Sequence, residues 1–281
     1  MTLPDREIAL VLSDVDGTLV KDDKSLTQAT IDAARALREQ GIRLAITSGR
    51  PPRGMQMLVE PLALEGMIAG FNGGVYVDPD MTVREARLLD PATARQAAEE
   101  IGKAGLDVWV YTSNDWLVRN PKAPHVEHEA FTVKFEPIVV PRFTDAHFGD
   151  CAKIVGVSDD YALVERVEQE MQGALDEHHS CAHSRPYYSA ARSQPYYLDV
   201  TSAKANKGAV VDTLAATYNI HHSQIATIGD GPNDRMMFRR GGFSIAMGNG
   251  SEEVRNSAKA VTDTNDNDGW AKAIRQYILR S

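Results

Sequence analysis

Four aspartates in two short clusters are the residues of this sequence whose types and spacing best suit chemistry. Asp14 and Asp16 lie in the segment LVLSDVDGTLV, and Asp230 and Asp234 lie in IATIGDGPNDRMMF, more than 200 positions later. Each cluster follows a short apolar run, so two parallel strands of one sheet would bring both clusters to the same carboxyl edge. Carboxylates crowded at one edge repel each other unless a cation lies among them. The pattern therefore predicts a divalent metal ion.

The first cluster also predicts a division of roles between its two acids. Gly17 follows Asp16 and allows a sharp turn, which would leave the side chains of Asp14 and Asp16 in the same space. One carboxylate could attack phosphorus to form an aspartyl phosphate, while the other protonates the leaving oxygen and later deprotonates water. Taken alone, the segment could equally be a turn with solvated acids.

Two other segments offer groups that could hold a phosphate. Thr47 and Ser48 follow an apolar run in LAITSGRPP, where hydroxyl and backbone N–H groups can contact phosphate oxygens. Lys207 opens a predicted helix and could place a cation on the same phosphate, with Lys204 as the competing lysine. Each of these signals is weak by itself, since TSG loops and lysines are common on protein surfaces.

The second cluster predicts the kind of metal. Asp230 ends a predicted strand, whereas Asp234 lies in the first turn of a helix and could simply favour the helix dipole. Both clusters contain oxygen ligands and neither contains Cys or His, a donor set that fits Mg²⁺ better than zinc or copper.

Strands and helices must alternate to position these residues, and the hydrophobic pattern predicts that they do. At the N-terminal end we expect strand 8–13, helix 27–40, strand 42–47, helix 54–64, strand 67–69 and a hairpin from 75–77. At the C-terminal end we expect helix 207–218, strand 225–229, helix 233–239, strand 243–246, and helices 252–258 and 268–279. Between them, helices 91–103 and 161–175 are separated by strand-like runs 107–112, 132–135 and 153–157. The expected fold is α/β: a Rossmann-like parallel-sheet core from residues 1–83 and 200–281, with an inserted α+β domain at 84–199.

Composition narrows the function classes. The 281 residues are 43% hydrophobic and 25% charged, which is typical of an ordinary globular protein. A net charge of −9 argues against nucleic acid as a partner, because binding to its phosphates relies on Lys and Arg. The N-terminal segment lacks the pattern of a secretory signal, and no apolar run approaches the ~18 residues of a membrane span. Two distant cysteines, Cys151 and Cys181, favour neither a disulfide framework nor zinc, so we expect a cytoplasmic protein without a membrane partner.

Together, the motifs resemble those of the haloacid dehalogenase superfamily of phosphotransferases. Four motifs occur in the family's order: DVDGT at 14–18, TSGR at 47–50, NKG with Lys207, and GDGPND at 229–234. Within this superfamily the chain is similar to the Cof-like subfamily IIB phosphatases, which carry a large C2-type cap inserted after the third core strand. The resemblance extends over essentially the whole chain.

The resemblance implies a role for each matching residue. Asp14 would be the nucleophile and Asp16 the general acid/base, protonated within the acidic cluster before it donates. The remaining implied roles are phosphate binding by Thr47, Ser48 and Lys207, Mg²⁺ binding by Asp14, Asp230 and the Asp16 carbonyl, support from Asn233 and Asp234, and substrate contact by Asn72 and Arg50. Arg50 could equally pair with a core carboxylate.

The implied activity is Mg²⁺-dependent hydrolysis of a small phosphomonoester, such as a sugar phosphate or a related metabolite. A phosphomutase with the same nucleophile is one alternative, and a noncatalytic sensor of a phosphorylated metabolite is another. The cap would select the substrate, but its polar candidates carry no assignment: Arg142, His147, His178, His179, His183, Arg185, Tyr187 and Tyr188. The physiological substrate and the oligomeric state stay open.

Overall fold

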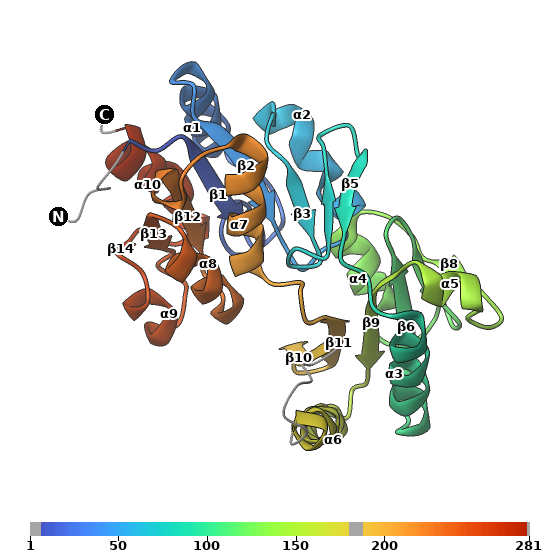
Figure 1. Cartoon of the computed structure of the whole chain (residues 1–281). Coiled ribbons are helices and arrows are strands. Elements are labelled where there is room, and N and C mark those ends of the chain that lie inside the picture. Colours follow the sequence, from blue (N-terminus) through green and yellow to red (C-terminus); the bar gives the residue numbers. More distant parts are fainter. Residues whose placement is uncertain (1–6, 180–187, 280–281) are drawn as a thin grey trace. The chain divides into compact units, whose positions relative to one another are not determined.

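A computed structural model describes residues 7–179 and 188–279 of the chain. The chain folds into two compact units (Figure 1). The core unit comprises Met1–Arg50, Met55–Arg84 and Asn206–Ser281, and the inserted unit comprises Pro51–Gly54 and Glu85–Ala205. His183, Arg185 and Tyr187 lie outside the described residues. No helix of the described residues is long and apolar enough to cross a membrane.

The core unit is built on an eight-stranded sheet with the order β14-β13-β12-β1-β2-β3-β4-β5. Strand β1 pairs in parallel with both β12 and β2, so the segments that carry the two aspartate clusters are neighbours. The bounds are β1 Leu10–Asp14, β2 Arg43–Thr47, β3 Ile68–Gly70, β4 Val75–Val77, β5 Val83–Ala86, β12 Ile225–Gly229, β13 Phe243–Ala246 and β14 Ala260–Val261. Antiparallel pairing begins between β3 and β4. The predicted α/β class with a parallel sheet is confirmed.

Helices cover both faces of this sheet (Figure 1). The bounds are α1 Gln28–Glu39, η1 Pro52–Leu58, α2 Val59–Leu62, α7 Lys207–Tyr218, η2 His222–Gln224, η3 Pro232–Asp234, α8 Arg235–Arg240, α9 Glu252–Asn256, η4 Asn265–Asn267, α10 Gly269–Ala273 and η5 Ile274–Leu279. Helix α1 begins at the N-cap Thr27, whose side chain accepts the Thr30 N–H, and Gly41 follows its end with a φ of 74°. A side-chain acceptor at the start and a left-handed glycine after the end are the features that delimit helices in general.

Strand β1 determines the direction of the first catalytic candidate. Successive side chains of a strand point to opposite faces. Leu10 and Leu12 pack in the cluster with residues of α7 and α8, whereas Ser13 accepts a hydrogen bond from Trp270 Nε1 of α10, 2.9 Å away. Asp14 has the same parity as Leu10 and Leu12, so its side chain emerges on the face covered by α7.

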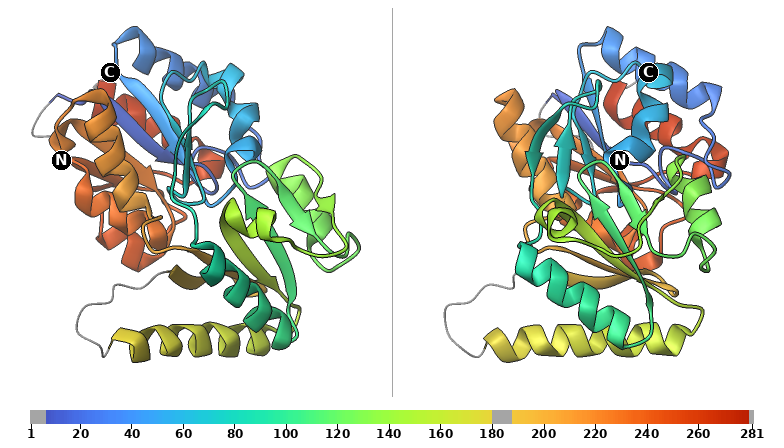
Figure 2. Two further views of the ribbon diagram at one scale, coloured as in Figure 1. Left: turned by 45° about the vertical axis from the view of Figure 1, so that its right-hand side comes forward. Right: turned by 90° about the vertical axis from the view of Figure 1, so that its right-hand side faces the viewer.

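The inserted unit contains a six-stranded sheet with the order β10-β11-β9-β6-β7-β8. The strands are β6 Asp107–Thr112, β7 Trp116–Val118, β8 Ile138–Val139, β9 Cys151–Val157, β10 Tyr188–Gln194 and β11 Tyr197–Ser202, and the helices are α3 Pro91–Lys103, α4 Val126–Val133, α5 Asp145–Gly149 and α6 Tyr161–His179. Helices α3 and α6 pack against one face, where their apolar residues share a core with alternate strand residues (Figure 2). Among the described strands of the inserted unit, only β7 and β8 pair in parallel.

One predicted element of this unit is wrong. The pattern at residues 132–135 predicts a strand, but the helix α4 runs through Val133 and ends at Lys134, which adopts a left-handed φ of 63°. Val126 and Val133 are both buried, and their separation corresponds to two helical turns. The short β-branched and aromatic run alone could not reveal this longer helical spacing.

Candidate active site

The centre of the site is a buried lysine between two buried carboxylates. Lys207 is the first residue of α7, and its Nζ donates to Asp14 Oδ1 at 2.5 Å and to Asp234 Oδ1 at 2.6 Å. The side chain of Lys207 is only 2% exposed, whereas Lys204 lies exposed at the surface. The opposite charges of Asp14 and Asp234 raise the pKa of Lys207 despite its burial, so the ammonium is charged.

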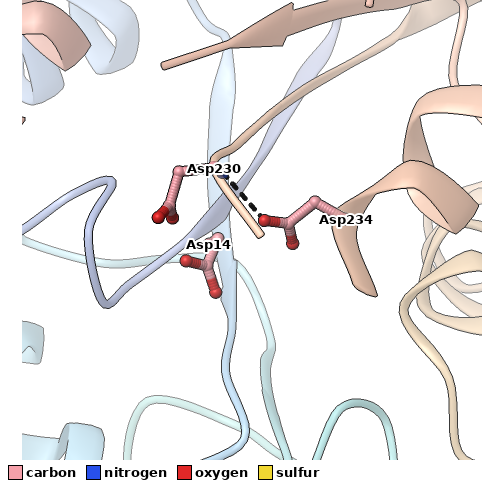
Figure 3. Close-up of side chains that lie close together, drawn as sticks. All are labelled: Asp14, Asp230 and Asp234. Atoms are coloured by element: carbon pink, nitrogen blue, oxygen red, sulfur yellow. Dashed lines mark hydrogen bonds between the residues drawn. The ribbon is translucent and has the colours of Figure 1, made fainter. Parts of the chain in front are cut away.

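The loop after β12 places two further carboxylates beside Asp14. The second oxygen of Asp234 accepts the backbone N–H groups of Asp230 and Gly231 at 2.9 and 2.8 Å, which closes the loop (Figure 3). Gly17 approaches this loop so closely that a Cβ atom there would lie 2.4 Å from an Asp230 carboxylate oxygen. Gly17 also has a φ of 72°, so the DVDGT turn requires glycine for both its conformation and its space.

The carboxylate cluster, defined as Asp14, Asp230 and Asp234, has a donor set that fits a divalent ion. Each residue offers one oxygen, and these oxygens all lie within 4.8 Å of one another (Figure 3). Burial raises the pKa of Asp14 well above its ordinary value against the opposing effect of Lys207, and the charges of Asp234 and Asp230 raise it further. Burial likewise raises the pKa of Asp230. Repulsion between the carboxylates and their burial disfavour ionisation of all three at once. A cation bound among these oxygens would offset that repulsion and favour the ionised forms.

Thr47 lies next to Asp14 and has an unsatisfied hydroxyl. The two residues are paired in register between β2 and β1, at the carboxyl edge of the sheet. Thr47 Oγ1 is buried and has no hydrogen-bond partner among the described residues. Its neighbour Ser48 is also buried, but the Ser48 hydroxyl accepts the Arg50 N–H at 3.1 Å and donates to Asp16 at 3.3 Å. Of these two hydroxyls, that of Thr47 is the one that a ligand could satisfy.

Asp16 lies in a different environment from the carboxylate cluster. Arg50 donates from Nε to Asp16 Oδ2 at 2.7 Å and from Nη2 to Asp16 Oδ1 at 2.5 Å, a bidentate contact. Lys24 Nζ donates to Asp16 Oδ1 at 2.8 Å. Partial burial by itself would raise the pKa of Asp16, but Arg50 and Lys24 lower it well below its ordinary value.

The expectation of a protonated Asp16 within an acidic cluster is therefore wrong for this structure. Asp16 is not among the three clustered acids, and Arg50 and Lys24 lower its pKa, which favours the ionised carboxylate. For Arg50 we considered substrate contact and pairing with a core carboxylate. The structure contains the second, a pairing with Asp16.

The remaining predicted residues lie at the rim of the site. Asn233 Nδ2 donates to Asn72 Oδ1 at 3.2 Å, so the two predicted loops are in contact. Asn233 is exposed and Asn72 is partly buried, whereas Asp14 and Asp234 are buried.

Three residues of the site had no assigned role in the sequence. Thr18 Oγ1 donates to Asp230 Oδ1 at 2.8 Å, and Asn249 Nδ2 donates to the Gly17 carbonyl at 2.8 Å and to Asp230 at 3.3 Å. Lys24 is the third. Thr18 belongs to the DVDGT motif, so its place in the motif was a usable signal, whereas Lys24 lies in a polar loop with no distinguishing pattern.

Comparisons with known proteins agree with the site and the fold. The model of the haloacid dehalogenase-like hydrolase family matches residues 11–274. A Bacillus subtilis 5-amino-6-(5-phospho-D-ribitylamino)uracil phosphatase is 25% identical over 276 residues, with 96% of this chain and 97% of the relative covered. The crystal structure of a haloacid dehalogenase-like hydrolase from Bacteroides thetaiotaomicron superposes with a TM-score of 0.84 at 28% identity, covering 96% of this chain and 99% of that one.

A second structure supports the same classification. It belongs to a Bacteroides thetaiotaomicron protein studied among the phosphatases of the haloalkanoate enzyme superfamily, with a TM-score of 0.77 and 28% identity. The match covers 96% of this chain and 95% of that one. The family predicted from the four motifs is confirmed. The chain belongs to the haloacid dehalogenase-like hydrolase family, within which it is a phosphatase.

Proposed function

We propose that this phosphatase hydrolyses a small phosphomonoester through an aspartyl phosphate on Asp14, with Mg²⁺ as its metal ion. The observation that carries the proposal is the buried hydroxyl of Thr47, which lacks a partner among the described residues and adjoins Asp14 in the sheet. A buried polar group without a partner costs about 1–3 kcal/mol. A phosphate oxygen bound there would satisfy Thr47 and place phosphorus near the Asp14 carboxylate.

Asp14 is the proposed nucleophile. Its carboxylate attacks phosphorus, an Asp14 O–P bond forms, and the bond from phosphorus to the leaving oxygen breaks. Lys207 serves this step in two ways, since its charge favours the ionised form of Asp14 and attracts the phosphate oxygens. Asp234 holds the ammonium of Lys207 in place from the other side.

Asp16 is the proposed acid and base. In the structure, Asp16 is a carboxylate held by Arg50 and Lys24. A carboxylate suits the second half of the reaction, in which Asp16 accepts a proton from the water that attacks the aspartyl phosphate. Donation to the leaving oxygen in the first half requires a protonated Asp16. We therefore propose that Asp16 exchanges its cationic partners for the substrate during turnover.

Asp14 and Asp230 are the proposed metal ligands, together with the Asp16 carbonyl that the family resemblance implies. Hard carboxylate oxygens are the ligands that Mg²⁺ prefers. When bound, the ion would offset the negative charges of nucleophile and phosphate. Thr18 and Asn249 orient Asp230 by hydrogen bonds to its two oxygens.

The proposed substrate is a phosphorylated polyol or sugar, or a related metabolite. The Bacillus subtilis relative is named for a substrate whose phosphate is carried on a ribityl chain. We propose that the inserted segment, predicted at 84–199, recognises the organic part of the substrate, and that Asn72 and Arg50 contact it from the core unit.

Replacement of the nucleophile is the sharpest test. Asp14→Asn removes the attacking oxygen, so release of phosphate from a panel of sugar phosphates, nucleotides and p-nitrophenyl phosphate should fall at least about a thousandfold. The matched control is Asp32→Asn, which removes an exposed carboxylate of α1 and should keep the parent rate. Phosphate release by Asp14→Asn at the parent rate would contradict the assignment.

Metal dependence and acceptor choice are tested on the unchanged enzyme. Removal of divalent ions by a chelator should abolish turnover, and Mg²⁺ should restore it; activity unaffected by chelation would exclude the proposed metal. Transfer of isotopically labelled phosphate to a sugar acceptor, in place of release to water, would identify a mutase. Binding without either product would identify a sensor.

A further inference from the structure

One cavity is lined entirely by residues of the inserted unit. Its volume is about 450 Å³, within the range of small-molecule sites. It is formed by one side of α3, by β6, by the residue that follows β7 and by the segment from 141 to 148, which includes most of α5. None of its lining residues belongs to the carboxylate cluster or to the loops around it.

The strand pattern explains why the cavity has an apolar floor and a charged rim. Val108 of β6 and Leu117 of β7 belong to the core that α3 covers, and Arg119 has the same parity as Leu117. Arg119 therefore emerges on the same face, just beyond the strand. Phe143 and Phe148 complete the floor, with ring centroids 6.3 Å apart and planes inclined by 64°.

Four cationic side chains but only one acidic side chain, that of Glu99, line this cavity. Arg95 is paired with Asp145 at 2.5 Å, and Lys103 is paired with Glu99 at 3.4 Å. Arg119 and Arg142 have no acidic partner among the described residues. Two guanidinium groups without an acidic partner therefore lie beside one cavity, in a chain whose net charge is −9.

Aromatic rings hold two of the guanidinium groups over the floor. Arg119 lies over the Phe143 ring with its guanidinium carbon 5.8 Å from the centroid, and Arg95 lies over Phe148 at 5.3 Å. Such contacts restrict the arginine side chains without using their N–H groups, so Arg119, which has no acidic partner among the described residues, can still donate to a ligand. Phe143 is itself only partly buried, so part of its ring faces the cavity.

We propose that this cavity binds a small anion that carries a planar, apolar body. The body packs against Phe143 and Phe148, and the anionic head receives hydrogen bonds from Arg119 and Arg142. The head is a phosphate or a carboxylate, both of which match the forked donors of arginine. The site shares no residue with the carboxylate cluster or with the proposed phosphate-binding and substrate-contacting residues of the core unit, since every residue that forms it lies in the inserted unit.

Calorimetric titration of the full chain with naphthalene-1-sulfonate tests the proposal. This probe has a tetrahedral anionic head on a planar body and is not a substrate for hydrolysis. The wild type should bind it with one saturable site. Arg119→Met combined with Arg142→Met should weaken binding at least tenfold, whereas Arg166→Met combined with Arg275→Met should not, although that pair removes the same charge from exposed positions elsewhere.

Three further ligands separate the contributions of head and body. Neutral 1-naphthol and inorganic sulfate should each bind at least tenfold more weakly than naphthalene-1-sulfonate, because each lacks one half of the recognised group. 1-Naphthoate in place of the sulfonate shows whether the head group is a carboxylate: tighter binding assigns a carboxylate, and weaker binding a phosphate-like head. Equal binding of naphthalene-1-sulfonate by the wild type and by Arg119→Met/Arg142→Met, or no binding by the wild type, would overturn the proposal.

Discussion

Asp14 and Asp16 are two residues apart in one motif, yet they lie in opposite electrostatic environments. Asp14 is buried in a cluster with two other acids, of which Asp230 is partly exposed, and one lysine, and its pKa is raised. Asp16 faces Arg50 and Lys24 without another acid in contact among the described residues, and its pKa is lowered. Neighbours brought by the fold, rather than the residue type or the position in the motif, decide the charge of each carboxylate.

The two environments also differ in how much they depend on a single side chain. In the carboxylate cluster, one ammonium that is 2% exposed serves two acids, so its loss leaves both without a cation. Around Asp16, two cations share one carboxylate whose side chain is 33% exposed, so the loss of either leaves a partner and access to water. Substitutions should therefore have large effects in the first environment and graded effects in the second.

Lys207→Met should produce the largest effect. It removes the cation between Asp14 and Asp234 while retaining an unbranched side chain of similar length. Loss of one partner from a buried ionic group costs about 3–5 kcal/mol, so the free energy of unfolding in urea should fall by about that amount. Phosphatase turnover should fall roughly 100- to 1,000-fold in the fraction that remains folded, since a positive charge near the phosphate is lost.

Lys204→Met is the control for this experiment. Lys204 lies three positions earlier and is exposed, so its replacement should change neither the turnover nor the unfolding free energy appreciably. If Lys207→Met retained the turnover of the parent, the proposed role of Lys207 in the reaction would be contradicted.

Arg50→Met should have an intermediate effect, visible in the titration of Asp16. Without the bidentate partner, the pKa of Asp16 should rise toward its ordinary value, which the ¹³C shift of the Asp16 carboxyl carbon reports during an acid titration. The free energy of unfolding should fall by about 1 kcal/mol near neutral pH, because the carboxylate keeps Lys24 and solvent.

The pH dependence of this stability difference has a defined sign. The folded-state pKa of Asp16 is lowered below the unfolded value, so the contact with Arg50 stabilises the fold above about pH 4. Acidification toward the lowered pKa protonates Asp16 and removes that contribution. The difference in stability between the parent and Arg50→Met should therefore shrink below about pH 4; a difference that grew on acidification would contradict the pairing.

The fold was predictable wherever local patterns carried the information. Strand 225–229 and helices 207–218 and 91–103 have the predicted bounds, because apolar runs and helix caps mark their ends. The N-cap Asn206, whose side chain accepts the Ala209 N–H, is such a mark. The strand expected at 132–135 is wrong because its residues continue the spacing of a helix that begins at Val126.

The site was predictable in its members but not in all of its contacts. Asp14, Asp230 and Asp234 gather as expected because β1 and β12 are parallel neighbours. The partners of Asp16 could not be foreseen, since Arg50 is 34 positions away and Lys24 reaches the acid from a loop in which its own φ is 68°. Such contacts depend on loop conformation, which has no periodic pattern in a sequence.

Lys24→Met should have the smallest effect on stability and on the pKa of Asp16. It tests whether the more buried of the two cations around Asp16, Arg50, contributes more than the more exposed one, Lys24. The Lys24 side chain is 21% exposed, compared with 3% for Arg50, and it makes one contact with Asp16 where Arg50 makes two. Water screens the more exposed charge, so the unfolding free energy should fall by only about 0.5 kcal/mol. The pKa of Asp16 should rise less than in Arg50→Met. The reverse order would mean that Lys24, rather than the buried guanidinium, keeps Asp16 ionised.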